Sequence, residues 1–294
     1  MVKHYKNIFS TVAICANSRS PKVMSIAKQC KEVLESKSIK IFYDQNFNEL
    51  DSKVFIIKSE KEIIKRSDLI IAIGGDGTML DCSRKYGAEG VPVIGINLGN
   101  LGFLTDINPD DLTSSLLKVL EGKYTLDKRF FLEVSINNEK EKYLALNEAV
   151  IHSGAVAQMI DYELFIDNNY VFSQKADGLI VSTNTGSTAY SLSGGGPIIH
   201  PKLEALCILP MFPHSLSSSS LVISSKDSIQ ISLKGSRSKC KLSLDSRKTI
   251  PVKKEGIISI KQSKKYLELI HLKGYSFFSA YRNKLGWGVG IVKK

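Results

Sequence analysis

Short hydrophobic runs alternate with longer amphipathic stretches over roughly the first 125 residues. This alternation is typical of buried parallel strands connected by helices that cover both faces of the sheet. The predicted strands are Ile8–Cys15, Ile39–Tyr43, Val54–Ile57, Leu69–Ile73 and Val91–Ile96. The predicted helices are Pro21–Ser36, Thr78–Tyr86 and Asp110–Glu121, with Ser20 and Pro21 as start signals and Gly122 as a stop signal.

After Lys128 the pattern changes to closely spaced apolar runs, which predict an antiparallel, sandwich-like β domain. The predicted strands are Phe130–Ile136, Tyr143–His152, Met159–Ile166, Tyr170–Gln174, Leu179–Thr183, Leu221–Ile223, Ile229–Leu233, Lys241–Leu244, Ile257–Ile260 and Leu267–His271. Residues 167–169, Asp-Asn-Asn, indicate a hairpin turn. Phe277–Leu285 has a helical pattern again, so we expect the C-terminal segment to return to the first domain.

The predicted fold class is therefore a doubly wound α/β domain followed by a β-rich domain. We expect the first domain to comprise residues 1–125 together with the returning segment 274–294, and the second to comprise residues 126–273. At 294 residues, with 43% hydrophobic residues, the chain can bury a core in each.

The composition indicates a cytoplasmic protein. No apolar run approaches the roughly 20 residues that span a bilayer, and the first residues lack the apolar core of a signal peptide. The five cysteines lack CxxC spacing and are expected to be reduced thiols: Cys15, Cys30, Cys82, Cys207 and Cys240.

The net charge of +11 raises the question of a nucleic-acid partner. The basic residues are mostly lysines, scattered along the chain without a basic stripe. Sites for nucleic acid usually cluster lysine and arginine with interleaved aromatic residues. We therefore expect no nucleic-acid partner, while the excess positive charge favours smaller anionic ligands such as nucleotides.

The most informative segment is Gly74-Gly-Asp-Gly-Thr-Met-Leu80, directly after the predicted strand Leu69–Ile73. Glycines at a strand-to-helix turn let backbone N–H groups approach a phosphate closely. An acid in such a loop would repel phosphates. Asp76 is therefore expected to have a role that compensates for this repulsion: it either forms the turn or takes part in chemistry beside the phosphate.

Two further segments interrupt apolar runs with polar residues. In the glycine-rich loop from Gly95 to Asp106, Phe103 and Leu104 are either an apolar wall against a base or simple hydrophobic anchors. Asn147 and Glu148 interrupt a β run, where unpaired polar groups are unfavourable. They are suited to bind the hydroxyls of a ribose, or they form a pair at a strand edge.

The third segment runs from Lys175 to Pro197 and is rich in glycine and hydroxyl side chains. We expect Ser187 or Thr188 to cap a helix there, and the hydroxyls with the helix N–H groups to form a second anion or nucleotide site. Walker-type, GxGxxG, GxSxG and HExxH motifs are absent from the sequence, which removes the usual support for oxidoreductase and hydrolase functions.

Taken together, these motifs resemble those of the NAD kinase family. Gly-Gly-Asp-Gly alone is shared with lipid kinases and phosphofructokinases, whereas Asn147-Glu148 together with Thr185-Gly-Ser-Thr-Ala-Tyr190 narrows the resemblance to NAD kinases. The resemblance covers nearly the whole chain and is strongest to the enterobacterial branch. It implies transfer of a phosphoryl group from ATP to the 2′-hydroxyl of the adenosine ribose of NAD, with Mg²⁺ or another divalent cation carried by ATP.

The resemblance also implies roles for individual residues. Asp76 corresponds to the general base. The residues expected to contact NAD are Gly77, Phe103, Leu104, Asn147, Glu148, Gln158, Lys175, Asp177, Thr185, Thr188, Ala189, Tyr190, Ser193 and Arg247. It further implies a homo-oligomer, expected to be a tetramer, assembled through the β-rich domain.

The chain departs from the family pattern at several positions. Asn184 replaces a usual proline and Gly195 a frequent alanine, and we expect both to loosen the backbone beside the site. A lipid kinase or a non-catalytic nucleotide sensor are the alternatives. The chain shows no amphipathic membrane-facing helix, and a pure binder gains nothing from Asp76 beside a phosphate.

Overall fold

The computed structural model describes residues 8–47, 56–57, 59–99, 102–137, 139–155, 158–215, 218–233 and 240–286. The chain forms two compact units. The first unit comprises Met1–Lys128 and Tyr266–Lys294, and the second comprises Arg129–Lys265. The long strands β5 (Tyr124–Ile136) and β15 (Ile257–Leu272) have residues in both units.

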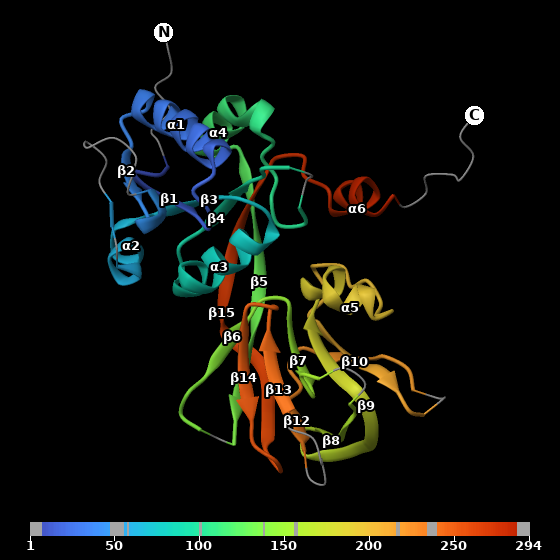
Figure 1. Cartoon of the computed structure of the whole chain (residues 1–294). Helices are drawn as coiled ribbons and strands as arrows, with labels where there is room; N and C mark the ends of the chain where they lie inside the picture. Colours follow the sequence, from blue (N-terminus) through green and yellow to red (C-terminus); the bar gives the residue numbers. More distant parts are fainter. Residues whose placement is uncertain are drawn as a thin grey trace, which may run out of the picture. The chain divides into compact units, whose positions relative to one another are not determined.

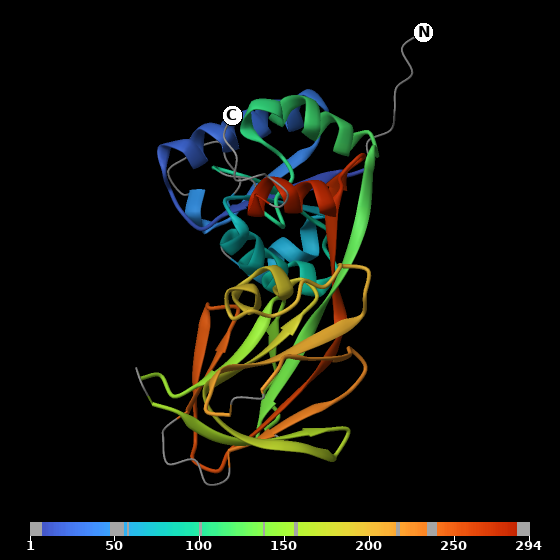
Figure 2. The same ribbon diagram turned by 90° about the vertical axis from the view of Figure 1, so that its right-hand side faces the viewer.

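The first unit contains a parallel sheet with strand order β2-β1-β3-β4-β15. Its strands are β1 (Thr11–Ala16), β2 (Lys40–Tyr43), β3 (Leu69–Ile73), β4 (Val93–Ile96) and the end of β15. Helices α1 (Pro21–Ser36) and α4 (Leu112–Leu120) lie against one face of the sheet, and α3 (Asp76–Lys85) lies against the other (Figures 1 and 2). The predicted doubly wound α/β fold is confirmed.

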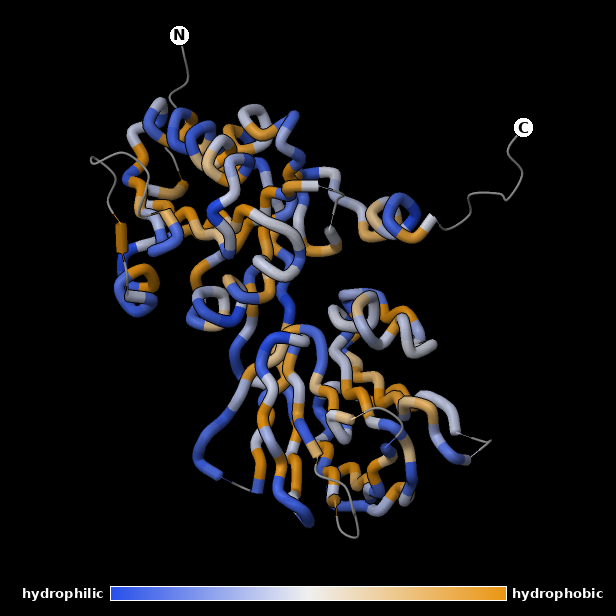
Figure 3. Tube along the Cα trace, in the orientation of Figure 1, coloured by the Kyte–Doolittle hydropathy of each residue, from blue (hydrophilic) through white to orange (hydrophobic). Residues whose placement is uncertain are grey.

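Local sequence accounts for most of these elements. Helix α1 has the predicted bounds, and the Ser20 hydroxyl accepts a hydrogen bond from Val23 N at 3.3 Å. The strands of the sheet are coloured mostly hydrophobic in Figure 3, while the helices around them alternate between hydrophobic and polar colours. This pattern reflects strands buried on both faces and helices buried on one.

Several boundaries differ from the prediction. Helix α3 begins at Asp76, two residues early, because Gly75 O already accepts the N–H groups of Thr78 and Met79. The short helix α2 (Glu60–Arg66) was not predicted. Of the predicted strand Val54–Ile57, the residues Val54 and Phe55 lie outside the described residues, and Ile56 forms a parallel bridge with Tyr43.

The C-terminal segment returns to the first unit, as predicted. Helix α6 (Phe277–Leu285) has the predicted bounds and ends at Gly286, whose φ of 63° is left-handed. The buried Tyr281 ring packs against Phe103 and Phe277, with centroid distances of 5.9 and 5.3 Å.

A buried histidine, His271, lies near the end of β15. His271 Nδ1 is 2.5 Å from Asp106 Oδ2, its Nε2 is 3.5 Å from Asp127 Oδ2, and its ring stacks on Tyr275. Burial lowers the pKa of His271, but the two carboxylates outweigh it and the pKa is raised. The contact between His271 and Asp106 connects the end of the glycine-rich loop to β15.

The second unit is antiparallel in all the strand pairs that the structure describes. Its strands follow the order β14-β13-β7-β9-β8-β12-β15, while β10 pairs with β9 and β11, and β6 with β5. Besides β5 and β15, the strands are β6 (Tyr143–Ala145), β7 (Glu148–His152), β8 (Ile160–Ile166), β9 (Asn169–Thr183), β10 (Ala205–Pro213), β11 (Leu221–Ser224), β12 (Ile229–Ser232), β13 (Cys240–Leu244) and β14 (Lys248–Val252).

Strand lengths in this unit were predicted less well than strand positions. The pairs of short strands predicted within 170–183 and 257–271 are each one long strand, β9 and β15. Strand β10 was missed because Pro210 and Pro213 lie in its apolar run. The hairpin is confirmed, since Asp167 and Asn168 have φ values of 48° and 64°.

Candidate functional site

The first part of the site is the turn between β3 and α3. Gly74 and Gly75 join the buried strand to Asp76, the first residue of the helix. A Cβ on Gly74 would collide with the Thr78 side chain, so the turn requires glycine there. Asp76 is about one-third exposed, with a side-chain accessibility of 32%.

The Asp76 carboxylate binds the glycine-rich loop. Its Oδ2 accepts a hydrogen bond from Phe103 N and its Oδ1 one from Leu104 N, both at 3.1 Å. A Cβ on Gly102 would collide with Asp76 Oδ1, which explains why glycine stands next to Phe103. Lys284, from helix α6, donates to Asp76 Oδ2 at 2.8 Å. Asp76 therefore connects the turn between β3 and α3 to the glycine-rich loop and to helix α6, and its side chain stays about one-third exposed.

Phe103 and Leu104 lie in different surroundings. The half-buried Phe103 ring lies 3.9 Å from Lys284 Nζ, a cation–π geometry. The Leu104 side chain is buried in the interior, and the Leu104 backbone N–H donates to Asp76. Gly77 follows in the first turn of α3.

The second part of the site, in the second unit, is the break between β6 and β7. The prediction of one strand over Tyr143–His152 was wrong, because the backbone turns toward Asp245. The Asp245 carboxylate accepts the N–H groups of Leu146, Asn147 and Glu148 at 3.0, 2.8 and 3.2 Å. Asp245 itself has a φ of 49°.

This arrangement satisfies the backbone and leaves two side chains available. Within the described part of the chain, Glu148 Oε2 is buried without a hydrogen-bond partner, and the Asn147 amide makes no side-chain hydrogen bond. Burial, and next the charge of Asp245, raise the pKa of Glu148 to about 8, although the Tyr190 N–H acts in the opposite direction. A buried carboxyl oxygen without a hydrogen-bond partner is unfavourable unless a polar ligand or another polar group pairs with it.

The hydroxyl-rich segment differs from its prediction. It folds into a 3₁₀ turn (Gly186–Thr188) and a four-residue helix, α5 (Tyr190–Ser193), and neither Ser187 nor Thr188 caps it. Ser187 Oγ instead donates to Asn184 O and accepts from Ile199 N, and Thr188 donates to Thr185 O. These two hydroxyls serve the loop, which weakens the case for a second anion site.

Asn184 also behaves differently from expectation. Its amide nitrogen donates to Pro201 O at 2.6 Å and to Leu203 O at 2.8 Å, so it holds the backbone there and does not loosen it. Gly195 has a φ of 85°, a conformation in which glycine is unstrained.

A cavity of about 530 Å³ lies beside this segment. Asp177 and Tyr190 line it, together with His152, Ser243 and Thr249. His152 Nε2 lies 3.0 Å from Ser243 Oγ, which lies 3.1 Å from Thr249 Oγ1. Burial and then the charge of Lys241 lower the pKa of His152, which favours its neutral form.

The other predicted residues lie around this core. Thr185 is buried and accepts from Arg129 Nη1 at 3.1 Å, while Ala189 is half-buried. Four predicted residues are exposed and none lines the cavity: Gln158, Lys175, Ser193 and Arg247.

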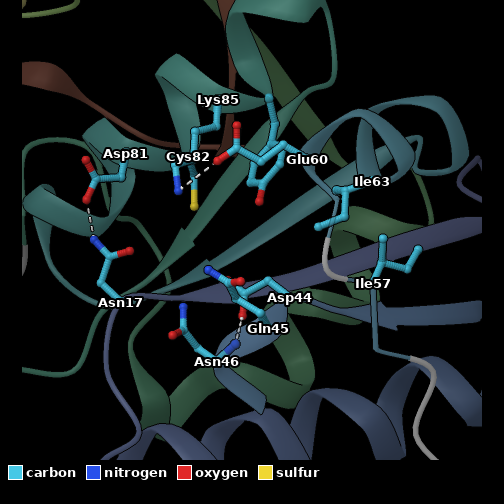
Figure 4. Close-up of a pocket in the computed structure, with 11 residues that line it drawn as sticks. Asn17, Asp44, Gln45, Asn46, Ile57, Glu60, Ile63, Asp81, Cys82 and Lys85 are labelled. Carbon is cyan, nitrogen blue, oxygen red and sulfur yellow. Dashed lines mark hydrogen bonds and ion pairs between the residues drawn. The ribbon is translucent and has the colours of Figure 1, made fainter. Parts of the chain in front are cut away.

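A second, smaller cavity of about 50 Å³ lies in the first unit and contains none of the predicted residues (Figure 4). Several of its polar side chains pair with one another or with the backbone. Asn17 donates to Asp81, and Lys85 pairs with Glu60 at 3.1 Å. Asp44 accepts from Ala16 N and Asn46 N. The polar side chains named here therefore already have partners within the first unit.

Sequence reasoning missed three contributors: Lys284, Asp245 as a backbone acceptor, and the buried Arg129. Asp245 stands before Ser-Arg, a turn-like sequence, but only the fold brings it to Asn147. Among the residues described, no three His, Cys, Asp or Glu side chains could hold a metal ion. Nor is any helix of the described residues long and apolar enough to cross a membrane.

Comparison with known proteins agrees with this architecture. Residues 12–124 match the family model of the ATP-NAD kinase N-terminal domain, and residues 146–272 match that of the C-terminal domain. The chain is 41% identical to the NAD kinase of Salmonella dublin over 285 residues, which cover 96% of this chain and 98% of the relative. It is also 41% identical to the NAD kinase of Erwinia tasmaniensis, over 95% and 97% of the two chains.

Two solved structures share the fold. Yeast NADH kinase, solved with NADH, superposes with a TM-score of 0.85 at 23% identity over 97% of this chain and 89% of that chain. An Archaeoglobus fulgidus NAD kinase, solved with ATP, superposes with a TM-score of 0.73 at 26% identity over 93% and 99%. Fold and motifs together define a kinase without a Walker loop. The chain belongs to the NAD kinase family.

The raised pKa of Glu148 predicts a pH-dependent stability. Between about pH 4.5 and 8 the folded protein holds a proton that the unfolded chain releases, so this residue makes stability fall as pH rises. Glu148→Gln removes that contribution. Thermal unfolding from pH 5 to 9 should show the Tm of the variant rising relative to wild type as pH increases. Asn147→Ala, which keeps the carboxyl, should show a constant difference, and a constant difference for Glu148→Gln would refute the assignment.

Proposed function

We propose that this chain transfers the γ-phosphoryl group of ATP to the 2′-hydroxyl of the adenosine ribose of NAD, producing NADP and ADP. Membership of the NAD kinase family supports the reaction. The observation that carries the mechanism is Asp76, a partly exposed carboxylate on a glycine turn at the carboxyl end of β3. Open α/β sheets bind ligands at this end of their strands.

In the proposed reaction Asp76 acts as the general base. The ribose hydroxyl gives its proton to the carboxylate while its oxygen forms a bond to the γ-phosphorus. The bond between that phosphorus and the β–γ bridging oxygen breaks, and ADP leaves with the electron pair. Asp76 then releases the proton to solvent.

Asn147 and Glu148 are proposed to bind ribose hydroxyls. The support is the buried Glu148 Oε2, which lacks a partner among the described residues, next to an amide that makes no side-chain hydrogen bond there. Asp177 lies in the large cavity and is proposed to bind near the nicotinamide half of NAD. The residues proposed to frame adenine and its ribose are Gly77, Phe103, Leu104, Thr185, Thr188, Ala189, Tyr190 and Ser193, with Gln158, Lys175 and Arg247 as outer contacts.

A divalent cation, Mg²⁺ by preference, is proposed to arrive with ATP as part of the substrate. It would neutralise charge on the phosphates during transfer. The protein is proposed to act in the cytoplasm.

The test of the catalytic proposal is Asp76→Asn. The amide cannot accept the ribose proton, so kcat for NADP formation from NAD, ATP and Mg²⁺ should fall by about 10²–10⁴-fold. The amide also replaces an acceptor facing Phe103 N and Lys284, so a moderate drop in Tm is expected. Asp81→Asn, in the same helix, is the matched control and should keep the wild-type kcat.

A near-normal kcat in Asp76→Asn would leave Asp76 as a turn residue only. Wild-type protein that phosphorylates diacylglycerol and forms no NADP would make the chain a lipid kinase.

The ribose contacts are tested by KM. Above the Glu148 pKa of about 8, Glu148→Gln replaces one carboxylate oxygen, an acceptor for a ribose hydroxyl, by an NH₂ group, so at pH 8.5 KM for NAD should rise about tenfold while KM for ATP changes little. Glu163→Gln, in β8, makes the same substitution outside the site and should leave both constants unchanged. An unchanged KM for NAD in Glu148→Gln would return the pair to a structural role.

We also propose that the chain forms a homotetramer through its β-rich unit. The support is the resemblance to the family. Sedimentation velocity at micromolar concentration should give the mass of four chains, and a monomer would refute the proposal.

A further inference from the structure

Lys284 places a positive charge directly beside Asp76, the proposed general base. Its ammonium is 2.8 Å from Asp76 Oδ2 and 3.9 Å from the centroid of the Phe103 ring. The side chain is 30% exposed, so solvent and solutes reach it.

Helix α6 fixes this position. Its buried face consists of Ala280 and Tyr281, and the Tyr281 ring packs on Phe103. Lys284 follows Tyr281 by three residues and therefore projects on the same side of the helix. The ammonium is thus delivered to Asp76 by a packed helix.

In this position Lys284 competes with a substrate for Asp76. A carboxylate oxygen has two lone-pair directions. Those of Oδ2 are used by Phe103 N and Lys284 Nζ. A ribose hydroxyl that approaches Oδ2 requires Lys284 to leave, and the ammonium then needs another anion.

We propose that Lys284 binds a phosphate group of ATP in the kinase site. Before ATP binds, Lys284 forms an ion pair with Asp76. The ammonium then moves to the phosphate oxygens of ATP, and Asp76 Oδ2 becomes free for the ribose hydroxyl. This inference rests on the proposed phosphoryl transfer. It couples the arrival of ATP to the release of the base.

The chemistry of the transfer is unchanged by this role. Lys284 forms and breaks only hydrogen bonds and an ion pair, and it keeps all three of its protons. On transfer, negative charge develops on the oxygen between the β- and γ-phosphorus atoms, and a neighbouring ammonium stabilises it.

The first test measures binding and does not depend on NAD. ATP with Mg²⁺, and AMP, are titrated separately into wild type, Lys284→Gln, Lys284→Arg and Arg282→Gln. Lys284→Gln should weaken ATP binding about tenfold or more and AMP binding less than about twofold, because it removes a charge-assisted contact to the outer phosphates. Arg282→Gln removes the same charge from the same helix, two residues away, and should match wild type.

The second test measures turnover. Lys284→Gln should raise KM for ATP and lower kcat, each about tenfold, with KM for NAD changed less than about twofold. Lys284→Arg should recover most of the loss, since arginine keeps the charge. A role limited to packing would lower Tm without this separation of ATP from AMP.

Three results would overturn the proposal. The first is a wild-type affinity for ATP in Lys284→Gln, and the second is an equal loss of affinity for ATP and for AMP in that variant. The third is a higher kcat in Lys284→Gln, which would mean that Lys284 inhibits the reaction by blocking Asp76. If wild type formed no NADP, the proposed function would fail, whereas the comparison of ATP with AMP would still decide the role of Lys284.

Discussion

The first unit depends on one carboxylate. Asp76 receives N–H groups from Phe103 and Leu104 and the ammonium of Lys284, so three segments distant in sequence meet at two oxygen atoms. Hydrogen bonds to a charged acceptor contribute about 1.5–3 kcal/mol each, and they fix positions as well as energies. The loop can approach closely only because residue 102 lacks a side chain. The requirement for a carboxylate at position 76 is therefore architectural.

In the second unit, too, an aspartate carboxylate holds the backbone by accepting N–H groups. Asp245 takes up three backbone N–H groups at the break between β6 and β7, which would otherwise be left unpaired in a buried place. Because Asp245 satisfies the backbone there, the side chains of Asn147 and Glu148 are not needed to pair these N–H groups. In both units an aspartate carboxylate holds a turn of the backbone by accepting N–H groups.

Local signals determined what could be read from the sequence. Helices α1 and α6 were predicted with their bounds because caps and periodicity lie within them. Asp76 was found because its glycines are adjacent in the chain. Lys284 lies 208 residues from Asp76, and Asp245 lies 98 residues from Asn147, so neither pairing leaves a local trace. The long strands β9 and β15 were divided because polar residues interrupt their apolar pattern.

The pairing of β15 with β4 has a consequence for biosynthesis. Leu269 lies parallel to Val93, so the central sheet of the first unit lacks one edge until the ribosome has made residue 269. During that interval β4 exposes an apolar edge that is open to misassociation. Lys284 emerges later still, so a nascent chain carries Asp76 without its ammonium partner. The contact between Asp76 and Lys284 therefore forms only after residue 284 has been translated.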